Sequence, residues 1–586
     1  MLKYTFVHKA YGQRYFDIHF ETSVNAEDEQ TTFCLPAWRP GRYQMSNFAQ
    51  FIQFFKASDA QGNPLKVEKN SNHEWHVHTK GCTEVNIHYN FFANHLDAGS
   101  SFVSEGLFYV NPINCAIFPK NRMEESCSIS IKVPPSFLIA TSLTPASESG
   151  SNDFTAKDYH ELVDSPFMAS EEICHQNFEV GGVDFHLWFY INDVPDFEKI
   201  IQDFTAFTKA QLAVMKRFPV TTYHYLFLIP PFQVYHGVEH QKSTVITLGP
   251  SYNFKTDLPL YSSFLGISSH ELFHTWNVKA LRPIEMQPYD YLKENHSELG
   301  YVAEGVTSYY GDLFLLRSQC FDFKKYAQIF QKYLLRHFDN DGRHFKSVAA
   351  SSIETWLDGY QKGSPARKTS IYVKGMLAAF ILDMRLRSKN KQNTNLDHVM
   401  REMYEKYQKS GFSSADYQAC IEELSGESFQ HYFDEVIFGT QDLEAPLQEA
   451  LGVIGLKMIF EKNPKTYERK LGFKITNTPS SLRISAIALE SPAAEDGLIE
   501  GDEICNINRI KANKDNFDAL VRHYTEAQSQ LYFGLYRNDQ YLEISVRPGN
   551  RNFCSLPTLV REPQVSFGAK KAFEAWSGMR YQEIIL

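Results

Sequence analysis

The sequence predicts a multidomain α+β protein, in which a β-rich N-terminal region precedes a mostly helical central region and a second, smaller β-rich region. Two observations lead to this prediction. The chain has 586 residues, which is too many for one hydrophobic core. The period of its hydrophobic pattern also changes along the chain, from two residues to three or four near residue 193 and back to two near residue 456.

Residues 1–192 are expected to form a β-sandwich. Apolar and polar residues alternate in four stretches of this region, at 16–20, 85–91, 129–133 and 183–191. Such alternation, interrupted by Gly, Pro and Asn, is typical of half-buried antiparallel strands. The segment LPAWRPGRYQ, residues 35–44, places a Pro-Gly turn between aromatic residues, and its simplest interpretation is a packed turn.

Residues 193–448 carry the helical pattern. The stretch DFEKIIQDFTAFTKAQLAVMKRF repeats apolar residues at spacings of three and four, which indicates a helix. Two short β-rich runs follow at 223–229 and 243–248. Helices are then expected near 261–278, 301–318, 323–337, 371–388, 395–408 and 414–425. Strands followed by a helical bundle predict an α+β domain of about 250 residues.

Residues 449–548 return to strand-like alternation around one helix, NFDALVRHYTEA, and residues 549–586 form a tail without a readable pattern. The net charge is -11 and no basic block occurs, which argues against nucleic-acid binding. No long apolar run predicts a membrane span, and charged residues near the N-terminus argue against a signal peptide. Nine scattered cysteines without a CxxC pair favour a reducing compartment, so a cytoplasmic location is expected.

Residues 270–274 read HELFH, a pattern with metal-binding spacing. On a helix, His270 and His274 lie on one face and can bind one ion, while Glu271 can reach a water held by that ion. The alternative is an amphipathic helix that carries these residues by chance. The preceding apolar run FLGI predicts that the helix is buried, and buried histidines need polar partners.

Glu304 offers a third ligand. It lies 30 residues beyond His274, in YVAEGVTSYYGDL, on the next expected helix. A catalytic zinc ion takes three protein ligands and leaves one position open for water. The alternative is a charge at the start of a helix, although a Glu on an apolar face is costly to bury without a partner.

The segments HELFHTWNVKALRP, EGVTSYYGDL and SPAAEDGLIEGD together resemble the glycyl aminopeptidase family of zinc metallopeptidases, and LPAWRPGRY is similar to the N-terminal signature of that family. The resemblance covers nearly the whole chain. It implies an N-terminal β-rich domain (1–192), a thermolysin-like zinc peptidase domain of the gluzincin type (193–448) and a PDZ domain (449–548), followed by the tail 549–586.

Two further stretches resemble aminopeptidase N. SIYVKGMLAAFIL is similar to its Y-x-K-G segment, which implies that the Tyr372 hydroxyl donates to the oxyanion of the tetrahedral intermediate. HGVEHQKS resembles its G-x-M-E-N segment, which implies that Gly237 and Glu239 bind substrate and that Glu239 receives the free α-amine. The match departs at His240 and is one residue shorter. The alternatives are a tyrosine packed among helices and a solvated loop glutamate.

A carboxylate four residues after the third ligand often orients a zinc-binding histidine, but that position is Ser308 here. Either Ser308 or Thr307 is therefore expected to take a weaker orienting role, or the acid comes from elsewhere. In the C-terminal region, KLGFKI at 470–475 resembles the carboxylate-binding loop of a PDZ domain, which implies the C-terminus of a peptide as a ligand. Such a domain can equally serve only as a scaffold.

The resemblance implies a Zn²⁺-dependent aminopeptidase that removes N-terminal glycine or alanine from peptides with a free N-terminus. Glu271 would act as the general base toward a metal-activated water. Two alternatives stay open at this point. One is a zinc endopeptidase whose PDZ domain recruits substrates, and the other is a non-catalytic PDZ adaptor.

Overall fold

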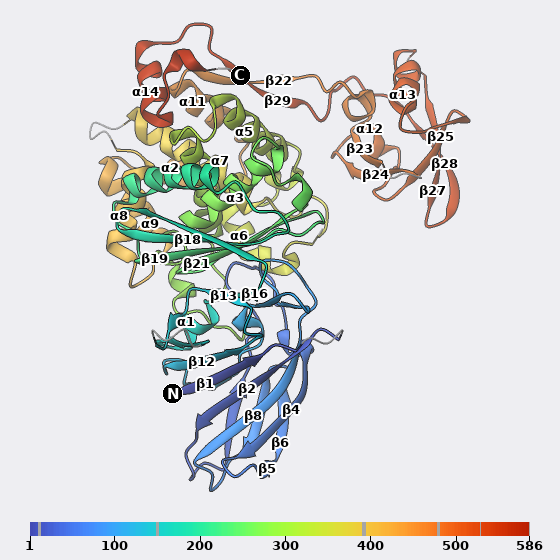
Figure 1. Ribbon diagram of the computed structural model, residues 1–586. Coiled ribbons are helices and arrows are strands. Elements are labelled where there is room, and N and C mark those ends of the chain that lie inside the picture. Colours follow the sequence, from blue (N-terminus) through green and yellow to red (C-terminus); the bar gives the residue numbers. More distant parts are fainter. Residues whose placement is uncertain are drawn as a thin grey trace. The chain divides into compact units, whose positions relative to one another are not determined.

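The computed structural model describes residues 1–9, 13–147, 152–361, 363–389, 394–477, 481–527 and 529–584 (Figure 1). The chain forms two compact units. Unit 1 comprises Met1–Asp322, Ala349–Gly363 and Lys389–Phe433, and unit 2 comprises Phe323–Val348, Ser364–Ser388 and Asp434–Leu586. A β-sheet domain followed by a helical central region confirms the predicted multidomain α+β class.

The N-terminal domain of unit 1 contains three sheets. The largest has the strand order β14 (Thr144–Pro145), β15 (Asp153–Ala156), β12 (Cys127–Lys132), β1 (Leu2–Val7), β2 (Tyr15–Ser23), β8 (Glu84–Phe92), β4 (Ile52–Asp59) and β5 (Pro64–Leu65). The second is β11 (Phe118–Pro119), β3 (Gln30–Cys34), β7 (Glu74–His78) and β6 (Val67–Ser71). The third is β13 (Leu138–Thr141), β16 (Phe167–Ser170), β10 (Phe108–Val110) and β9 (Phe102–Val103).

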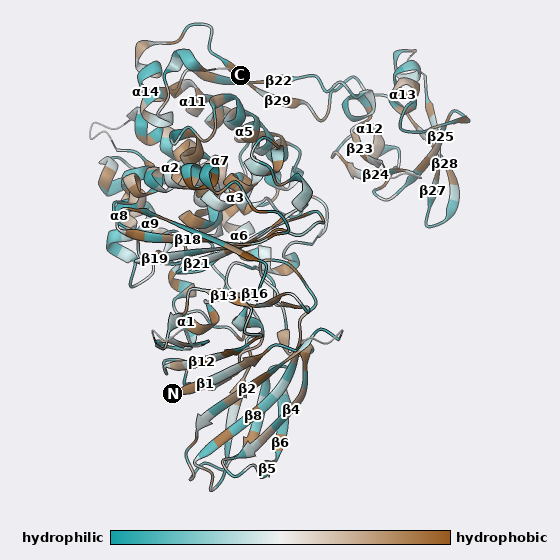
Figure 2. Ribbon diagram, in the orientation of Figure 1, coloured by the Kyte–Doolittle hydropathy of each residue, from teal (hydrophilic) through white to brown (hydrophobic). Residues whose placement is uncertain are grey.

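Aromatic side chains fill the space between the first two of these sheets. Phe20 on β2 meets Phe33 on β3 with ring centroids 5.9 Å apart, and Phe55 on β4 stacks on Trp75 of β7 at 4.7 Å. Buried and half-buried residues alternate along β8, as the period-two pattern predicts. Figure 2 shows that hydrophilic and hydrophobic residues both occur along the strands of this domain. The apolar face of each strand therefore defines the core of the domain.

A fourth sheet begins the central region, with the order β17 (Ile173–Val180), β18 (Val183–Tyr190), β19 (Thr222–Leu228), β21 (Ser243–Gly249) and β20 (Val234–Glu239). Strands β19 and β21 occupy the two expected β-rich runs and pair in parallel. The sequence did not predict β20, since VYHGVE has no clear apolar alternation. It pairs antiparallel with β21 and lies at the edge of this sheet.

The helices of unit 1 are α1 (Tyr159–Val163), α2 (Phe197–Met215), α3 (Pro259–Phe273), α4 (Thr307–Arg317), α6 (Val348–Asp358), α8 (Leu396–Tyr407), α9 (Ser414–Ser425) and α10 (Gln430–Tyr432). Helix α3 ends five residues before the expected boundary of 278, because the chain turns at His274. A π-helical turn, Tyr301–Val306, precedes α4. None of the helices in the described ranges combines the length and apolarity of a membrane-spanning segment.

Unit 2 contains α5 (Phe323–Phe338), α7 (Ile371–Lys389), α11 (Glu444–Val453), β22 (Leu456–Glu461), β29 (Leu556–Arg561) and α14 (Phe567–Ser577). Strands β22 and β29 pair antiparallel along their whole length. The tail forms part of the core of this unit, since Phe573 and Trp576 of α14 contact Phe323 and Tyr326 of α5. The sequence carried no readable sign of this packing.

The stretch between β22 and β29 folds as a C-terminal module. It contains β23 (Phe473–Asn477), β24 (Leu482–Ile487), α12 (Pro492–Glu495), β25 (Glu503–Ile507), β26 (Ile510–Lys511), α13 (Phe517–Glu526), β27 (Leu531–Arg537) and β28 (Gln540–Val546). Apolar side chains of its strands and of α13 form a separate core. Gly497 and Gly501 adopt φ of +93° and +94°, which favours glycine at both turns.

Candidate active site

Helix α3 and the turn that follows it bring the ring nitrogens of two histidines close together. The Nε2 atoms of His270 and His274 lie 3.0 Å apart. The Oε2 atom of Glu304 lies 3.8 Å from the first of these nitrogens and 3.5 Å from the second. These three ligand atoms lie within 4.8 Å of one another, so one ion can contact all of them.

Glu304 reaches this position from the π-helical turn before α4. Such turns are frequent at functional sites, since the wider turn re-aims a side chain. Asn277 holds the turn in place, because its side-chain amide donates to the carbonyl oxygen of Val302 at 2.9 Å and to Thr307 Oγ1 at 3.0 Å. Asn277 lies only three residues after His274, so the histidines and Glu304 share one support.

The contacts of His274 Nδ1 show which nitrogen of this ring can bind a metal. His274 Nδ1 lies 2.8 Å from the carbonyl oxygen of Asn277 and 3.5 Å from Thr307 Oγ1. A carbonyl only accepts, so Nδ1 carries a proton, and Nε2 is the nitrogen of this ring that can bind an ion. Of the two orienting residues that the sequence suggested, Thr307 makes this contact, while Ser308 is buried in α4.

The electrostatics of the centre favour a cation. Burial, helped by the carboxylates of Glu239 and Glu304, raises the pKa of Glu271 to about 8 against the opposing effect of His274. Against the cost of burial, Glu304 raises the pKa of His274 to about 10. Burial lowers the pKa of His270. Three buried carboxylates therefore face two imidazoles, and Oε2 of Glu271 has no hydrogen-bond partner among the described residues. A divalent cation fits this donor set.

Strand β20 passes directly over Glu271. A Cβ added to Gly237 would collide with the Glu271 carboxylate, so only glycine allows this approach. Glu239, at the end of the same strand, is 6 % exposed, and its carboxylate lies within 4.8 Å of Glu271 and His274. The structure thus brings six residues predicted from the sequence, on two helical segments and one strand, to a single centre: Gly237, Glu239, His270, Glu271, His274 and Glu304.

The N-terminal domain adds residues to this centre that the sequence did not suggest. The Tyr43 hydroxyl donates to Glu304 Oε1 at 3.0 Å, which leaves Oε2 for the histidines and the ion. Gly41 has a φ of +76°, and an added Cβ would lie 2.5 Å from Glu239 Oε2. The segment 35–44 is therefore more than a packed turn. The polar residues around its Pro-Gly turn were the available signal.

Comparison with known proteins agrees with this geometry. Residues 3–171 match the peptidase M61 N-terminal domain, and residues 263–378 match the M61 glycyl aminopeptidase family. The chain is a metallopeptidase, and its two matched segments are similar to the M61 family. The second match includes both histidines, Glu271 and Glu304, whereas β20 lies outside both matched ranges.

One solved structure shares the fold of this chain over nearly its whole length. An aminopeptidase N family protein from Idiomarina loihiensis superimposes with a TM-score of 0.90 at 22 % identity, covering 98 % of this chain and all of that one. An M1 zinc metallopeptidase from Deinococcus radiodurans has a TM-score of 0.46 at 12 % identity, covering 75 % of this chain and 94 % of that one. No curated protein matches the sequence.

Tyr372 lies in the first turn of α7, where it is half-buried. It belongs to unit 2, while the metal-binding cluster belongs to unit 1. Its role toward an oxyanion stays a prediction and is tested below.

Proposed function

We propose that this chain is a zinc-dependent aminopeptidase that removes small N-terminal residues, glycine or alanine, from peptides. The observation that carries the proposal is the position of Glu239, a buried carboxylate within 4.8 Å of both Glu271 and His274. A free N-terminus is a cation, and a buried carboxylate beside the reacting carbonyl is a direct way to recognise it. The preference for small residues rests on the family resemblance.

His270, His274 and Glu304 would hold the zinc ion. When bound, zinc polarises a carbonyl oxygen and lowers the pKa of a water to near neutrality. Glu271 takes a proton from the attacking water and then donates it to the leaving amine. Its carboxylate is suited to both steps because it lies within 4.8 Å of His274, beside the position that the ion and its water would occupy.

Strand β20 would bind the peptide backbone of the substrate. It is an edge strand, and an extended peptide can add to such an edge through main-chain hydrogen bonds. Gly237 lets the strand lie against Glu271, and Glu239 ends it where the first substrate residue would stop. This order of residues favours release of one residue from the N-terminus over cleavage inside a chain.

Replacement of Glu239 tests this function. Glu239→Ala should reduce kcat/KM for glycyl and alanyl arylamides. The loss corresponds to about 2–4 kcal/mol of transition-state stabilisation, because the substrate ammonium loses its partner in a desolvated site. N-acetylated versions should be poor substrates of the native enzyme and no worse for the variant. Glu239→Gln keeps the size of the side chain and removes its charge, so it measures the contribution of the charge alone. Rapid cleavage inside blocked peptides by the native enzyme would instead favour an endopeptidase.

Tyr372→Phe tests the proposed oxyanion donor. We expect kcat to fall about a hundredfold with little change in KM, because one such hydroxyl acts mainly in the transition state. Steady-state kinetics on an alanyl arylamide measure both constants. A rise in KM at constant kcat would assign Tyr372 to substrate binding instead.

We further propose that the first two sheets form a β-sandwich, that the centre is thermolysin-like and that the C-terminal module is a PDZ domain. Two features support the last assignment. Strand β23 lies at the edge of its sheet, and Gly472, just before it, adopts a φ of +75°. A peptide C-terminus would pair with this edge. The nine free cysteines support a cytoplasmic location.

Removal of the C-terminal module tests whether it is needed for folding of the enzyme or only for recruitment of substrates. Replacing residues 463–554 by a short Gly/Ser linker keeps the pairing of β22 with β29, so we expect soluble enzyme that cleaves dipeptide-sized substrates within about threefold of the native rate. Truncation at residue 450 removes Phe573 and Trp576 from the core of unit 2 and should give insoluble protein. Loss of dipeptide hydrolysis in the linker variant would show that the module contributes to catalysis.

A further inference from the structure

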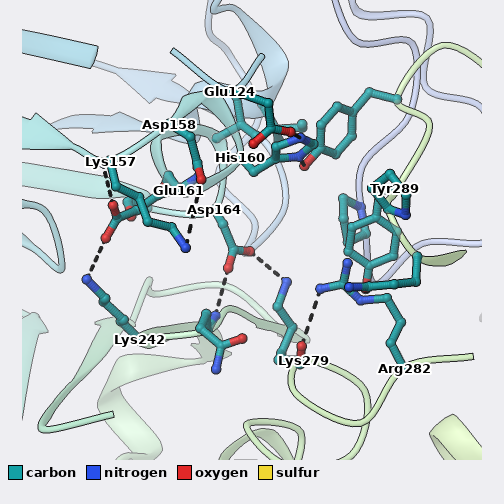
Figure 3. Close-up of a pocket in the computed structure, with 18 residues that line it drawn as sticks. Glu124, Lys157, Asp158, His160, Glu161, Asp164, Lys242, Lys279, Arg282 and Tyr289 are labelled. Carbon is teal, nitrogen blue, oxygen red and sulfur yellow. Dashed lines mark hydrogen bonds and ion pairs between the residues drawn. The ribbon is translucent and has the colours of Figure 1, made fainter. Parts of the chain in front are cut away.

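Asp164 is a carboxylate of the N-terminal domain that lies among residues of the central domain. It directly follows α1, and it lines a cavity of about 300 Å³ (Figure 3). The cavity has acidic and basic side chains from both domains, and most of them form ion pairs. Asp164 differs from the others because it contacts two separate segments that lead to the active site.

Each oxygen of Asp164 has its own partners. Oδ1 accepts a hydrogen bond from Lys279 Nζ at 2.7 Å and lies 3.1 Å from His240 Nδ1. Oδ2 accepts from the backbone N–H of Gln241 at 2.8 Å. In Figure 3, Asp164 points between Lys279 on one side and the segment before Lys242 on the other. One side chain thus connects the end of β20 with the chain after α3.

Both segments lead directly to the active site. Glu239 is the last residue of β20 and immediately precedes His240 and Gln241. The backbone N–H of Lys279 donates to the carbonyl oxygen of His274 at 3.0 Å. At this end of β20, Glu239 pairs with Thr244 of β21, and the His240 N–H donates to the carbonyl oxygen of Ser243 at 2.9 Å in the turn that joins the two strands. Asp164 adds further contacts at the point where Glu239 must be placed.

These bonds are strong enough to order the segment. The Lys279 side chain is 3 % exposed, so its charge requires the Asp164 carboxylate as a partner. Although burial alone would raise it, Lys279 and His240 hold the pKa of Asp164 well below its usual range. Asp164 is therefore ionised, and hydrogen bonds to a charged acceptor are shorter and stronger than those between neutral groups.

We propose that Asp164 is a positioning residue, which fixes the Glu239 carboxylate through His240 and Gln241 so that it meets the substrate ammonium without rearrangement. This inference rests on the proposed aminopeptidase function. A carboxylate held in advance binds a cation more tightly than a mobile one, since no freedom is lost on binding. The N-terminal domain would thereby contribute to selection of free N-termini without touching the substrate at this point.

The test compares Asp164→Asn with a matched control, Glu161→Gln. Glu161 lies on α1, lines the same cavity and pairs with Lys242 Nζ at 2.5 Å, but it contacts neither His240 nor Lys279. The readout is the ratio of kcat/KM for a glycyl peptide to that for its N-acetylated form. In Asp164→Asn this ratio should fall at least about tenfold, mainly through KM, with metal content unchanged. In Glu161→Gln it should stay within about twofold of the native ratio.

A second variant covers the case in which Asp164→Asn does not fold. Asp164→Ala combined with Lys279→Met removes the buried charge pair as a whole, and such replacements are often tolerated. The same fall in the ratio is expected. An unchanged ratio in either soluble variant would overturn the role of Asp164. A native enzyme without preference for the free amine would instead overturn the proposed function itself.

Discussion

Glu271→Gln should bind metal as tightly as the native protein while its turnover falls about a thousandfold or more. The reason is that Glu271 lies beside the three residues that we propose as metal ligands and is not one of them in that proposal. Gln keeps the size of the side chain, which fits against Gly237, but it cannot take a proton from water. The substitution therefore removes the chemistry and leaves the ligand set intact.

Elemental analysis measures the metal content of the variant, and the kinetics of alanyl arylamide hydrolysis measure its turnover on the same preparation. Thermal unfolding of the metal-loaded variant serves as the control for folding. Gln has nearly the same size as Glu, so the substitution should leave the unfolding temperature close to that of the native protein. Retained activity at full metal content would remove Glu271 from the mechanism.

Glu304→Ala should lose the metal. Two histidines alone bind zinc weakly, because a catalytic site takes three protein ligands. Glu304 is also the carboxylate that approaches both histidine nitrogens, at 3.8 and 3.5 Å. We expect less than about one tenth of native zinc content after dialysis, with activity lost in proportion.

Tyr43→Phe should have a smaller effect on metal binding than Glu304→Ala. It removes the hydrogen bond to Glu304 Oε1 but keeps the ligand, so metal affinity should fall only about 10- to 100-fold. Titration with a chelator of known affinity distinguishes the two variants without reference to activity. A fully loaded Glu304→Ala protein would place the third ligand elsewhere.

The sequence determined the parts of this protein that depend on local spacing. Residues four apart on a helix lie on one face, so HELFH predicts that His270 and His274 meet whatever the rest of the fold does. Period-two alternation likewise predicts strands such as β8. The need for a third ligand on the next expected helix added Glu304. The resemblance to a peptidase family added Gly237 and Glu239, but it did not place them on strand β20.

Only the tertiary structure decided which distant residues support that centre. Tyr43 and Glu304 are 261 residues apart, and Asp164 and Lys279 are 115 apart. Hydrophobic periodicity predicts that a face is buried, but it does not predict which buried acid pairs with which base. The packing of α14 on α5 was hidden for the same reason. Pairing of buried polar groups depends on distance in space, which the chain sets only when it folds.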